Sequence, residues 1–374
     1  MAPGHAAHDA YRAAARFPSL DGLRCVAILP VVWHHATLGP LPGILGRGPL
    51  GVDLFFAISG FLITTLLLRE RDDTGRVSAR AFYARRTLRI FPLYYAVLGL
   101  YVLYAWLGMT PGAQRTHFWQ SLPFFATYTT NWFVHFGVPH PVSFAFAWSL
   151  ATEEQFYLLW PWIVRTRSRW VVPTMVATTL LLVQEGVAHG WWVLVPGSLG
   201  QRIALSLAPP ICMGALLAMA LHGRGAYCVL YRLLGGRWSA AAMFAGMVLT
   251  AWLDGVPLWL AQLVLTLVVG ACVVRPDHSL VRILELRAVR WIGTVSYGIY
   301  LMHVGVITAV RTLLPSRFGQ PGIVFALAVP VTVLVASVSY RFFEEPLLRL
   351  RARFRPAAQS AFSAQRSRPA SFAR

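Results

Sequence analysis

A small set of ionisable side chains falls inside the apolar stretches of this 374-residue sequence. They are histidines, an aspartate and two adjacent glutamates: His34, His35, Asp53, Glu153, Glu154 and His303. An ionisable group in hydrocarbon is costly, so such residues usually mark an active site or a substrate path. Imidazoles and carboxylates are also the groups that most often transfer protons in catalysis. We therefore expect a polar site that either catalyses a reaction or conducts a solute.

Structural explanations for some of these residues stay open. Asp53 lies near the start of an apolar stretch, where its side chain could simply cap the first amides of a helix. One member of the His34–His35 pair, or of the Glu153–Glu154 pair, could face water or lipid headgroups without a further role. Carboxylates and imidazoles on separate stretches at similar depth nevertheless favour a functional site over a purely structural network.

The composition is typical of a membrane protein, with 57% of the residues apolar and only 13% charged. The net charge of +19 does not indicate nucleic-acid binding, because the basic residues lie between apolar segments and not on one solvated face. The cysteines form no C-x-x-C pair, so we predict small buried hydrophobic residues and no metal site. They are Cys25, Cys212, Cys228 and Cys272.

The apolar stretches that must position these residues are about as long as a bilayer requires, roughly 17–25 residues, with a few shorter ones. They fall near 22–38, 50–68, 90–109, 147–164, 170–184, 201–221, 238–253, 257–273, 292–312 and 322–343. The pattern predicts an all-α integral membrane protein, a bundle of about ten transmembrane helices. The seventh and eighth segments could instead form one long helix broken at 254–256. The stretch 116–146 is aromatic but interrupted by proline, asparagine and histidine, and is predicted to be an outer loop, partly interfacial.

Arginines indicate the orientation, because basic loops face the cytoplasm. On one side of the predicted membrane they number two before the first stretch, seven in 69–89, three in 165–169, three in 222–237, four in 274–290 and seven in the tail, against five on the other side. Ten spans then make both termini cytoplasmic in a multi-pass protein of the inner (cytoplasmic) membrane, with the ionisable residues at the midplane or in the outer half. No cleavable signal peptide is evident. We expect a cytoplasmic segment at 1–19, a transmembrane domain at 20–350 and a basic, disordered cytoplasmic tail at 351–374.

Helical spacing groups some of the candidates. Arg24 and His35 would share a helix face to within about 20° and stand about 16 Å apart along its axis. Arg86 and Arg89, at i and i+3, also share a face. Arginine suits bidentate phosphate capture, so this pair could hold the phosphates of a nucleotide-bearing cofactor. Anchoring among lipid headgroups on the cytoplasmic side is the alternative for the pair.

Several motifs in order closely resemble acyltransferase family 3, membrane-bound O-acyltransferases that include O-antigen acetylases and macrolide O-acyltransferases. The motifs are Leu20-Asp-Gly-Leu-Arg24 followed by His35, Gly51-Val-Asp-Leu-Phe-Phe-Ala-Ile-Ser-Gly60, Arg86-Thr-Leu-Arg89, Trp148-Ser-Leu-Ala-Thr-Glu153-Glu-Gln-Phe-Tyr157, Ser296-Tyr-Gly-Ile-Tyr-Leu-Met-His303 and Arg341-Phe-Phe-Glu-Glu-Pro346. The resemblance implies a ten-helix enzyme that takes an acyl group from cytoplasmic acyl-CoA. The acceptor would be a hydroxyl, often of a sugar on an extracytoplasmic glycan.

By that likeness Arg24 and His35 match the first-helix motif, Arg86 and Arg89 the donor-associated pair, and Glu153 the fourth-helix acid. We hypothesise that acyl-CoA, most simply acetyl-CoA, rests its phosphates on the three arginines, while His35 acts as general base oriented by Glu153. Transient acylation of His35 is the other route. Asp53 is a further catalytic candidate, and the possible supporting residues are Ser59, Glu154, Tyr297 and His303.

Two features depart from the family pattern. Met302 stands where a larger aromatic residue is expected, and no appended hydrolase-like domain is evident, so the acceptor would reach the membrane site directly. The acceptor could be a surface polysaccharide, a peptidoglycan-related sugar, a glycolipid, or a secondary metabolite such as a macrolide antibiotic. Nothing in the sequence specifies an oligomeric state.

A transporter or flippase of a polar or acylated solute is the competing function, because polar groups at depth and prolines within spans also suit carriers. The prolines are Pro30, Pro209, Pro210 and Pro330. The absence of evident inverted repeats, together with an arginine pair suited to phosphate, favours the enzyme. A membrane sensor without chemistry is a third possibility.

Overall fold

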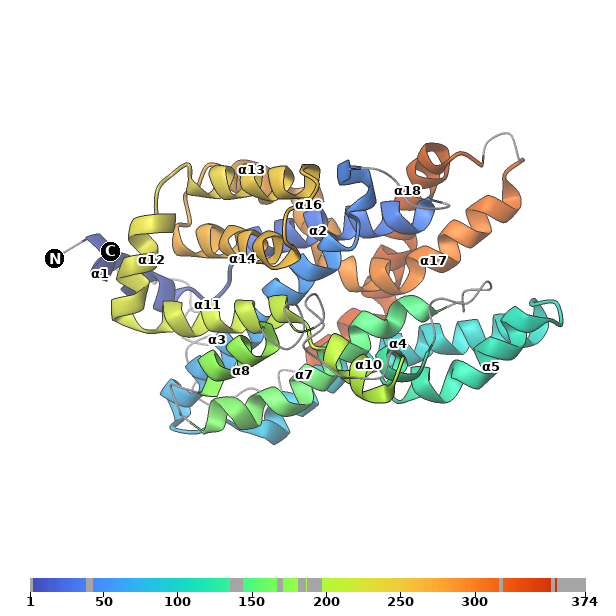
Figure 1. Cartoon of the computed structure of the whole chain (residues 1–374), viewed down its shortest axis with the longest axis horizontal. Helices are drawn as coiled ribbons and strands as arrows, with labels where there is room; N and C mark the ends of the chain where they lie inside the picture. Colours follow the sequence, from blue (N-terminus) through green and yellow to red (C-terminus); the bar gives the residue numbers. More distant parts are fainter. Residues whose placement is uncertain are drawn as a thin grey trace, which may run out of the picture.

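The computed structural model describes most of the chain: residues 3–37, 43–134, 144–166, 171–180, 186, 197–315, 319–350 and 354. Across these residues all regular secondary structure is helical, as the apolar pattern predicts, and Figure 1 shows the helices gathered into one bundle. Apart from residue 354, the tail predicted to be disordered lies outside the described residues. The same holds for 135–143 of the predicted outer loop and 181–184 of the fifth apolar stretch.

Several of the described helices are long and apolar enough to cross a membrane. Three qualify alone: α3 (Leu50–Thr74), α4 (Ala79–Leu107) and the run Pro321–Leu350, made of α18 (Pro321–Ser339), η5 (Tyr340–Glu344) and α19 (Glu345–Leu350). Two bent pairs would raise the number to five: α10 (Leu199–Leu205) with α11 (Pro209–His222), and α16 (Arg287–Thr294) with α17 (Ser296–Leu313). These helices support a multi-span membrane protein, while the number ten stays a prediction.

The other described helices are shorter or more polar than these. In chain order they are α1 (Pro3–Ala13), α2 (Pro18–Ala36), η1 (Gly43–Gly46), α5 (Ala113–Ala126), α6 (Thr130–Phe133), η2 (Ala145–Ala147), α7 (Trp148–Arg165), α8 (Val171–Leu180), α12 (Arg224–Leu234), α13 (Ser239–Trp252), α14 (Leu258–Val274) and α15 (Val281–Leu284).

The seventh and eighth apolar stretches form two helices and not one broken helix. α13 ends where Leu253 turns extended, and α14 begins after Pro257. Between them Gly255 has φ +79°, a left-handed conformation that only glycine adopts without strain. The two helices pack against each other and lie side by side in Figure 1. The segment is therefore a helical hairpin.

The prediction of an outer loop over 116–146 is wrong for its first half, which is mostly helical. α5 buries Phe118 and Phe125, seven residues apart on one helix face, both with no exposed surface. The Tyr94 hydroxyl of α4 donates to the Phe125 carbonyl at 2.8 Å. A helix docked beside α4 explains the aromatic residues that the loop prediction left without a role.

α2 and α3 run through the middle of the bundle, and small residues let their neighbours approach closely. A Cβ atom on Gly60 of α3 would lie 1.9 Å from the Ile211 carbonyl oxygen of α11, and one on Gly214 would lie 2.1 Å from that of Ala57. On α2, a Cβ at Gly22 would meet the Leu284 carbonyl oxygen at 2.3 Å. Close backbone packing of this kind is how helices associate in membranes.

The start of α7 is fixed by a strained turn. Phe144 has φ +78°, which is unfavourable for a residue with a side chain. Its buried ring packs against the rings of Tyr94, Tyr101, Phe125 and Phe146, and these contacts hold the turn in place. The turn determines where α7 begins and therefore how deeply its carboxylates lie.

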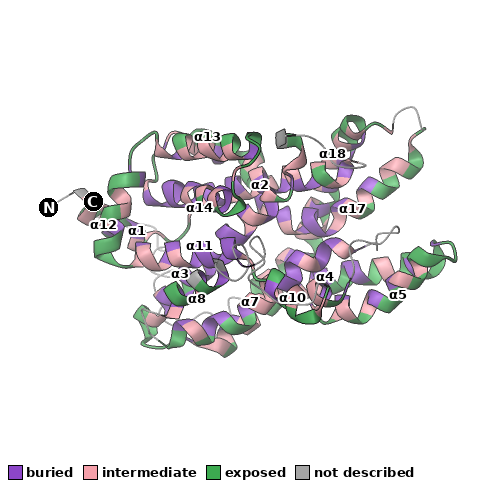
Figure 2. Ribbon diagram, in the orientation of Figure 1, coloured by how far each residue is buried: buried purple, intermediate pink, exposed green. Residues whose placement is uncertain are grey.

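Large apolar side chains cover the outer faces of several helices. Figure 2 shows the buried residues concentrated on helices such as α2 and α11, with exposed residues more frequent on α5 and α13. The exposed apolar residues of α4, α7 and α18 include Leu100, Leu103, Trp106, Leu107, Leu158, Leu159, Trp162, Leu334 and Val338. Surfaces of this kind suit contact with lipid and not with water.

Candidate active site

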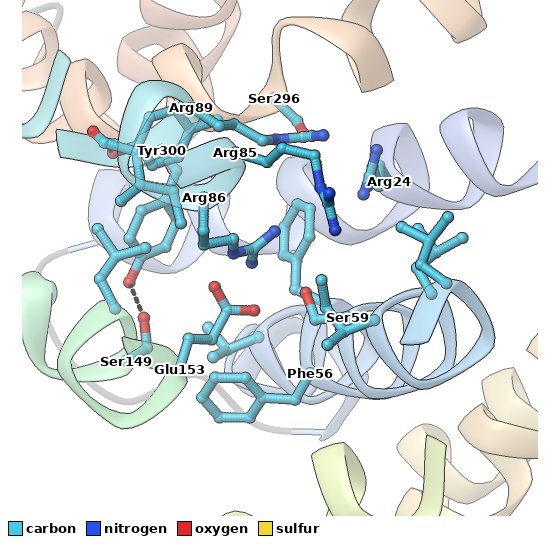
Figure 3. A pocket seen from close by; sticks show the side chains of 18 of the residues that line it. Arg24, Phe56, Ser59, Arg85, Arg86, Arg89, Ser149, Glu153, Ser296 and Tyr300 are labelled. Carbon is cyan, nitrogen blue, oxygen red and sulfur yellow. Dashed lines mark hydrogen bonds between the residues drawn. The ribbon is translucent and has the colours of Figure 1, made fainter. Parts of the chain in front are cut away.

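A cavity of about 190 Å³ lies between α2, α3, α4, α7 and α17. Apolar side chains of α3 form much of its wall, and Figure 3 shows the polar groups that point into it. The polar lining residues are Arg24, Ser59, Arg85, Arg86, Arg89, Ser149, Glu153, Ser296, Tyr297 and Tyr300. The lining thus carries four arginines and a single glutamate, a strongly positive balance.

Three of the arginines come from the first turns of α4. This helix begins at Ser78, whose hydroxyl accepts from the Ala81 amide at 3.3 Å, so Arg85, Arg86 and Arg89 follow two to three turns later. Arg89 follows Arg85 by four residues and Arg86 by three, so both are its neighbours on the helix surface. The predicted pair is therefore part of a larger arginine cluster.

Sequence reasoning overlooked Arg85, although its i,i+4 relation to Arg89 was visible. Its guanidinium donates to Glu70 Oε2 at 2.7 Å, and Glu70 is buried with 2% of its surface exposed. Glu70 Oε1 in turn accepts from the Ser78 amide at 2.9 Å. This carboxylate therefore anchors the arginine cluster to the turn between α3 and α4.

Arg86 is the most enclosed member of the cluster. Its guanidinium stacks over the Tyr157 ring of α7 at 3.7 Å from the ring centroid, a cation–π contact. Its Nε is buried and has no hydrogen-bond partner among the described residues. A buried guanidinium with unused donor capacity can bind an anionic ligand.

Arg24 approaches the cavity from α2. It pairs with Asp21 at 3.2 Å, one turn earlier, and lines the same wall as the α4 arginines. Figure 3 shows Arg24, Arg85 and Arg89 directed toward a common space. Arg24, Arg86 and Arg89, the three residues that the sequence assigned to donor binding, thus line one cavity although they come from two helices.

Hydroxyl groups lie at the other end of the cavity. The Tyr300 hydroxyl donates to the Phe146 carbonyl at 2.7 Å and lies 2.6 Å from Ser149 Oγ. Because Tyr300 has one proton and gives it to the carbonyl, Ser149 must be the donor in the second bond. Neither Ser149 nor Tyr300 was predicted as a site residue. Glu153, one turn beyond Ser149 on α7, projects into the cavity opposite Arg86 (Figure 3).

His35 pairs with a second histidine, not with a carboxylate. His303 Nε2 lies 3.2 Å from His35 Nδ1, and the ring centroids are 4.7 Å apart. No hydrogen bond joins His35 to Glu153 in the part of the chain that the structure describes, so the predicted orienting contact is replaced by His303. His303 has no exposed surface and also packs against Phe146 and Tyr300.

The carbonyl partners of the two rings determine which nitrogens carry protons. His303 Nδ1 lies 2.6 Å from the Tyr300 carbonyl and His35 Nδ1 lies 3.0 Å from the Val31 carbonyl, and a carbonyl only accepts. Each neutral ring therefore carries its proton on Nδ1. The single Nδ1 proton of His35 is then shared between the Val31 carbonyl and His303 Nε2, and His35 Nε2 keeps a lone pair with no recorded partner among the described residues.

The histidine pair does not itself line the arginine cavity. Tyr300 does line it and also contacts His303, so the pair lies directly behind this wall. Arg24 and His35 sit near opposite ends of α2, as predicted, but only Arg24 reaches the cavity. Ser59 and Tyr297, predicted as supporting residues, both line it.

Two predicted carboxylates lie outside the cavity. Asp53 is not a helix N-cap: α3 begins after Pro49 without a side-chain cap, and Asp53 Oδ2 accepts from Gln262 Nε2 of α14 at 3.3 Å. The N-cap interpretation is therefore wrong. Glu154 is not in the cavity wall, and its buried Oε1 has no hydrogen-bond partner among the described residues.

The cysteines and potential metal ligands are scattered. Cys25, Cys212 and Cys272 are buried, while Cys228 is half-buried, and all are free thiols. Within the described ranges no group of three His, Cys, Asp or Glu side chains is arranged to hold a metal ion. The chemistry available at the cavity is thus that of arginines, hydroxyls, a carboxylate and the adjacent imidazoles.

The model of an acyltransferase domain family matches residues 17–341, which include every cavity residue described above and all the motifs except the last, whose residues after Arg341 lie beyond the match. The chain belongs to this family. The match agrees with the resemblance to acyltransferase family 3 seen in the motifs. No solved structure matches the chain.

Curated relatives of this acyltransferase domain are named for O-acetylation. Peptidoglycan O-acetyltransferase OatA of Listeria monocytogenes is 29% identical over 356 residues, covering 88% of this chain and 55% of the relative. YrhL of Bacillus subtilis, provisionally named a peptidoglycan O-acetyltransferase, is 30% identical over 372 residues, covering 88% and 54%. A Staphylococcus aureus protein provisionally named an O-acetyltransferase is 29% identical, covering 90% and 58%. The chain spans little more than half the length of these relatives.

Proposed function

We propose that this chain is a membrane-embedded O-acyltransferase that moves an acyl group, most simply acetyl, from acyl-CoA to a hydroxyl of a cell-envelope glycan. One observation carries the proposal: a single cavity joins an arginine cluster at one end to Ser149, Glu153 and Tyr300 at the other, with the histidine pair directly behind Tyr300. The peptidoglycan O-acetyltransferases among the relatives support a glycan acceptor.

The arginine end of the cavity suits the phosphates of acyl-CoA. Arginine binds phosphate oxygens through two parallel hydrogen bonds, and several arginines together match a nucleotide carrying more than one phosphate. The apolar α3 side chains, among them Leu62, Ile63 and Leu66, would cover the pantetheine arm. The thioester would then reach the hydroxyl end, near the histidines.

His35 is the general base of this proposal, acting through Nε2. The acceptor hydroxyl loses its proton to Nε2 as its oxygen attacks the thioester carbonyl carbon, and the C–S bond breaks as the proton returns to the leaving thiolate. His35 becomes an imidazolium in between, and its Nδ1–H stays bonded to His303 Nε2 and the Val31 carbonyl. His303 thus takes the orienting role first assigned to Glu153. Glu153 instead faces Arg86 across the donor cavity.

A membrane topology follows from the same arrangement. We propose ten spans with both termini in the cytoplasm, because the segment 69–89, which includes the end of α3 and the start of α4, contains seven arginines and lies at the donor end of the cavity. His35 and the N-terminal end of α3 would then lie toward the outer side. The donor and the acceptor would approach the reaction centre from opposite faces of the bilayer.

The test uses the whole chain, purified in detergent, with acetyl-CoA labelled in the acetyl group and soluble peptidoglycan fragments. We expect labelled glycan to form, and His35→Ala to lower the rate about 10²–10⁴-fold, the usual value of a general base. His34→Ala is the matched control, because the neighbouring ring is exposed and should leave turnover unchanged. Normal turnover in His35→Ala would show that His35 is not the general base. Movement of a solute without thioester cleavage would support a carrier instead.

A further inference from the structure

A second, larger cavity lies beside the donor cavity, and the Asp53 side chain is part of its lining. It measures about 370 Å³ and lies where the N-terminal ends of α3, α7, α11 and α14 meet. This volume falls within the range of about 300–1,000 Å³ typical of small-molecule sites. Its polar lining comprises Arg47, Asp53, Ser206 and Gln262, with the Trp148 ring beside them.

The cavity opens at the histidine end of the bundle. Gly48, in the turn before α3, packs so closely on α2 that a Cβ there would lie 2.4 Å from His34 Cβ. Asp53 follows little more than one turn later on α3. The arginine cluster, by contrast, packs beside the C-terminal half of α3, through Glu70. The second cavity therefore lies beside the N-terminal end of α3, and the arginine cluster of the first lies beside its C-terminal half.

The Asp53 carboxylate can accept further hydrogen bonds. Its Oδ2 accepts from Gln262, while the structure records no partner for Oδ1 and no cation paired with the carboxylate among the described residues. A carboxylate mostly buried in a cavity needs partners that donate hydrogen bonds. Arg47, in the same lining, is directed at Asp254 at 3.7 Å.

One side chain separates the two cavities. Phe56 lines both of them, is 3% exposed, and meets the Trp148 ring edge-on at a centroid distance of 6.4 Å. A hydroxyl held in the second cavity would therefore lie across Phe56 from a thioester in the first. The acceptor of an acyl transfer has to occupy such a neighbouring position.

We infer that this second cavity binds the acceptor, as a hydroxyl-rich sugar ring held by Asp53, Gln262 and Trp148. The carboxylate and amide bond to ring hydroxyls, and the indole covers the apolar face of the ring, while Pro209 and Leu258 close the remaining surface. The inference rests on the proposed function and adds the place and chemistry of acceptor recognition.

Steady-state kinetics with separate titration of the two substrates tests this assignment. Trp148→Ala and Asp53→Asn should each raise the KM for a peptidoglycan disaccharide about tenfold, while the KM for acetyl-CoA stays unchanged. Trp148→Phe should recover part of the loss, because it keeps an aromatic face. Trp106→Ala, at an indole 64% exposed on α4, is the control and should behave as wild type.

Calorimetric titration of the disaccharide into the wild-type protein and Asp53→Asn measures the same site without turnover. A matching tenfold loss of affinity supports the assignment. Equal binding by both proteins, or a raised KM for acetyl-CoA in place of the acceptor KM, overturns it. If the wild type cleaves no thioester at all, the proposed function is wrong. Loss of sugar binding in Asp53→Asn would even then support a sugar site in the second cavity.

A sugar ring could come from a glycan strand or from a glycosylated macrolide. Repeating the titration with both compounds distinguishes these sources. Binding of either compound that depends on Asp53 and Trp148 supports the cavity, and the tighter compound identifies the source. Binding of neither overturns the inference.

Discussion

His303 Nε2 lies 3.2 Å from His35 Nδ1, although the two residues are 268 positions apart in the chain. Since the Tyr300 carbonyl holds the proton of His303 on Nδ1, this neutral imidazole can only accept from His35. In the proposed mechanism this histidine does what a carboxylate does in many acyl-transfer sites, orienting the general base, but without bringing a second charge into the membrane.

His303 should therefore act as a positioning residue for His35. His303→Leu removes the acceptor of the Nδ1 proton, so we expect kcat to fall about 10–100-fold, as when partners that orient a functional histidine are lost. The KM for acetyl-CoA should stay the same, and His303→Gln should restore part of the rate because its amide oxygen can accept. The check is kcat measured across pH, where the leucine variant should show an altered acid limb. Equal losses in both variants, with an unaltered pH profile, would indicate a packing role only.

The arginine cluster should set the affinity for the donor. Arg86→Lys keeps the charge but loses the planar fork and the stacking on Tyr157, so we expect the KM for acetyl-CoA to rise about tenfold with little change in the acceptor KM. Arg80→Lys, at an exposed arginine in the first turn of the same helix, provides the comparison. If both lysine variants have the wild-type donor KM, the cluster is an anchor for lipid headgroups.

The contact between α3 and α11 should tolerate no added methyl group. Gly60→Ala would place Cβ 1.9 Å from the Ile211 carbonyl oxygen, so the helices must separate, at a cost of about 1–3 kcal/mol. Gly99→Ala on α4, which meets nothing within 4 Å, should be neutral or slightly stabilising. Thermal unfolding in detergent compares the two, and equal midpoints would show that α3 and α11 do not depend on this close approach.

His278, in the segment between α14 and α15 and outside the proposed spans, should make the protein sensitive to acid. Ser19 Oγ donates to Glu285 at 2.8 Å, so His278 Nε2 must be the donor in its 3.0 Å bond to Ser19. Its Nδ1 is buried without a partner. Burial lowers the pKa of His278 below its usual 6.5, despite the opposing charges of Glu285 and Asp277.

The lowered pKa of His278 determines how the stability of the protein depends on pH. The His278 side chain is neutral in both the folded and the unfolded chain well above pH 6.5. Below about pH 6.5 the unfolded chain binds a proton at His278 more readily than the folded chain does. The free energy of unfolding therefore falls as the pH drops. His278→Gln keeps a donor to Ser19 and should flatten the fall in the unfolding midpoint between pH 7.5 and 5.5. An unchanged slope in the variant would mean that another group is responsible.

The arginines of the donor cavity were predictable because the relevant relation is local. Arg86 and Arg89 share a face of one helix at any tertiary arrangement, and Arg85 obeys the same rule. The partner of His35 was not predictable in this way. Whether Glu153 or His303 meets His35 depends on how α2, α7 and α17 pack, and both residues lie at comparable depth. The motif containing His303 was visible in the sequence, but its contact was not.

The helical nature of the chain followed from the apolar pattern, whereas the role of its aromatic segments did not. The interruptions of 116–146 by proline, asparagine and histidine predict a loop, although Phe118 and Phe125 lie on one face of α5 and dock beside α4. Asp53 likewise looked like a cap because it stands near the start of α3. Only the tertiary structure shows Gln262 of α14 opposite its carboxylate.

The wall formed by Phe56 bears on how the membrane stays sealed during turnover. In the proposed arrangement, with the donor in one cavity and the sugar in the other, neither substrate would need to cross the bilayer, and only the few atoms of an acetyl group would change sides. A ring that yields to so small a group can still block protons and ions. Such an enzyme could modify material outside the cell with a cytoplasmic metabolite and leave the ion gradients of the cell intact.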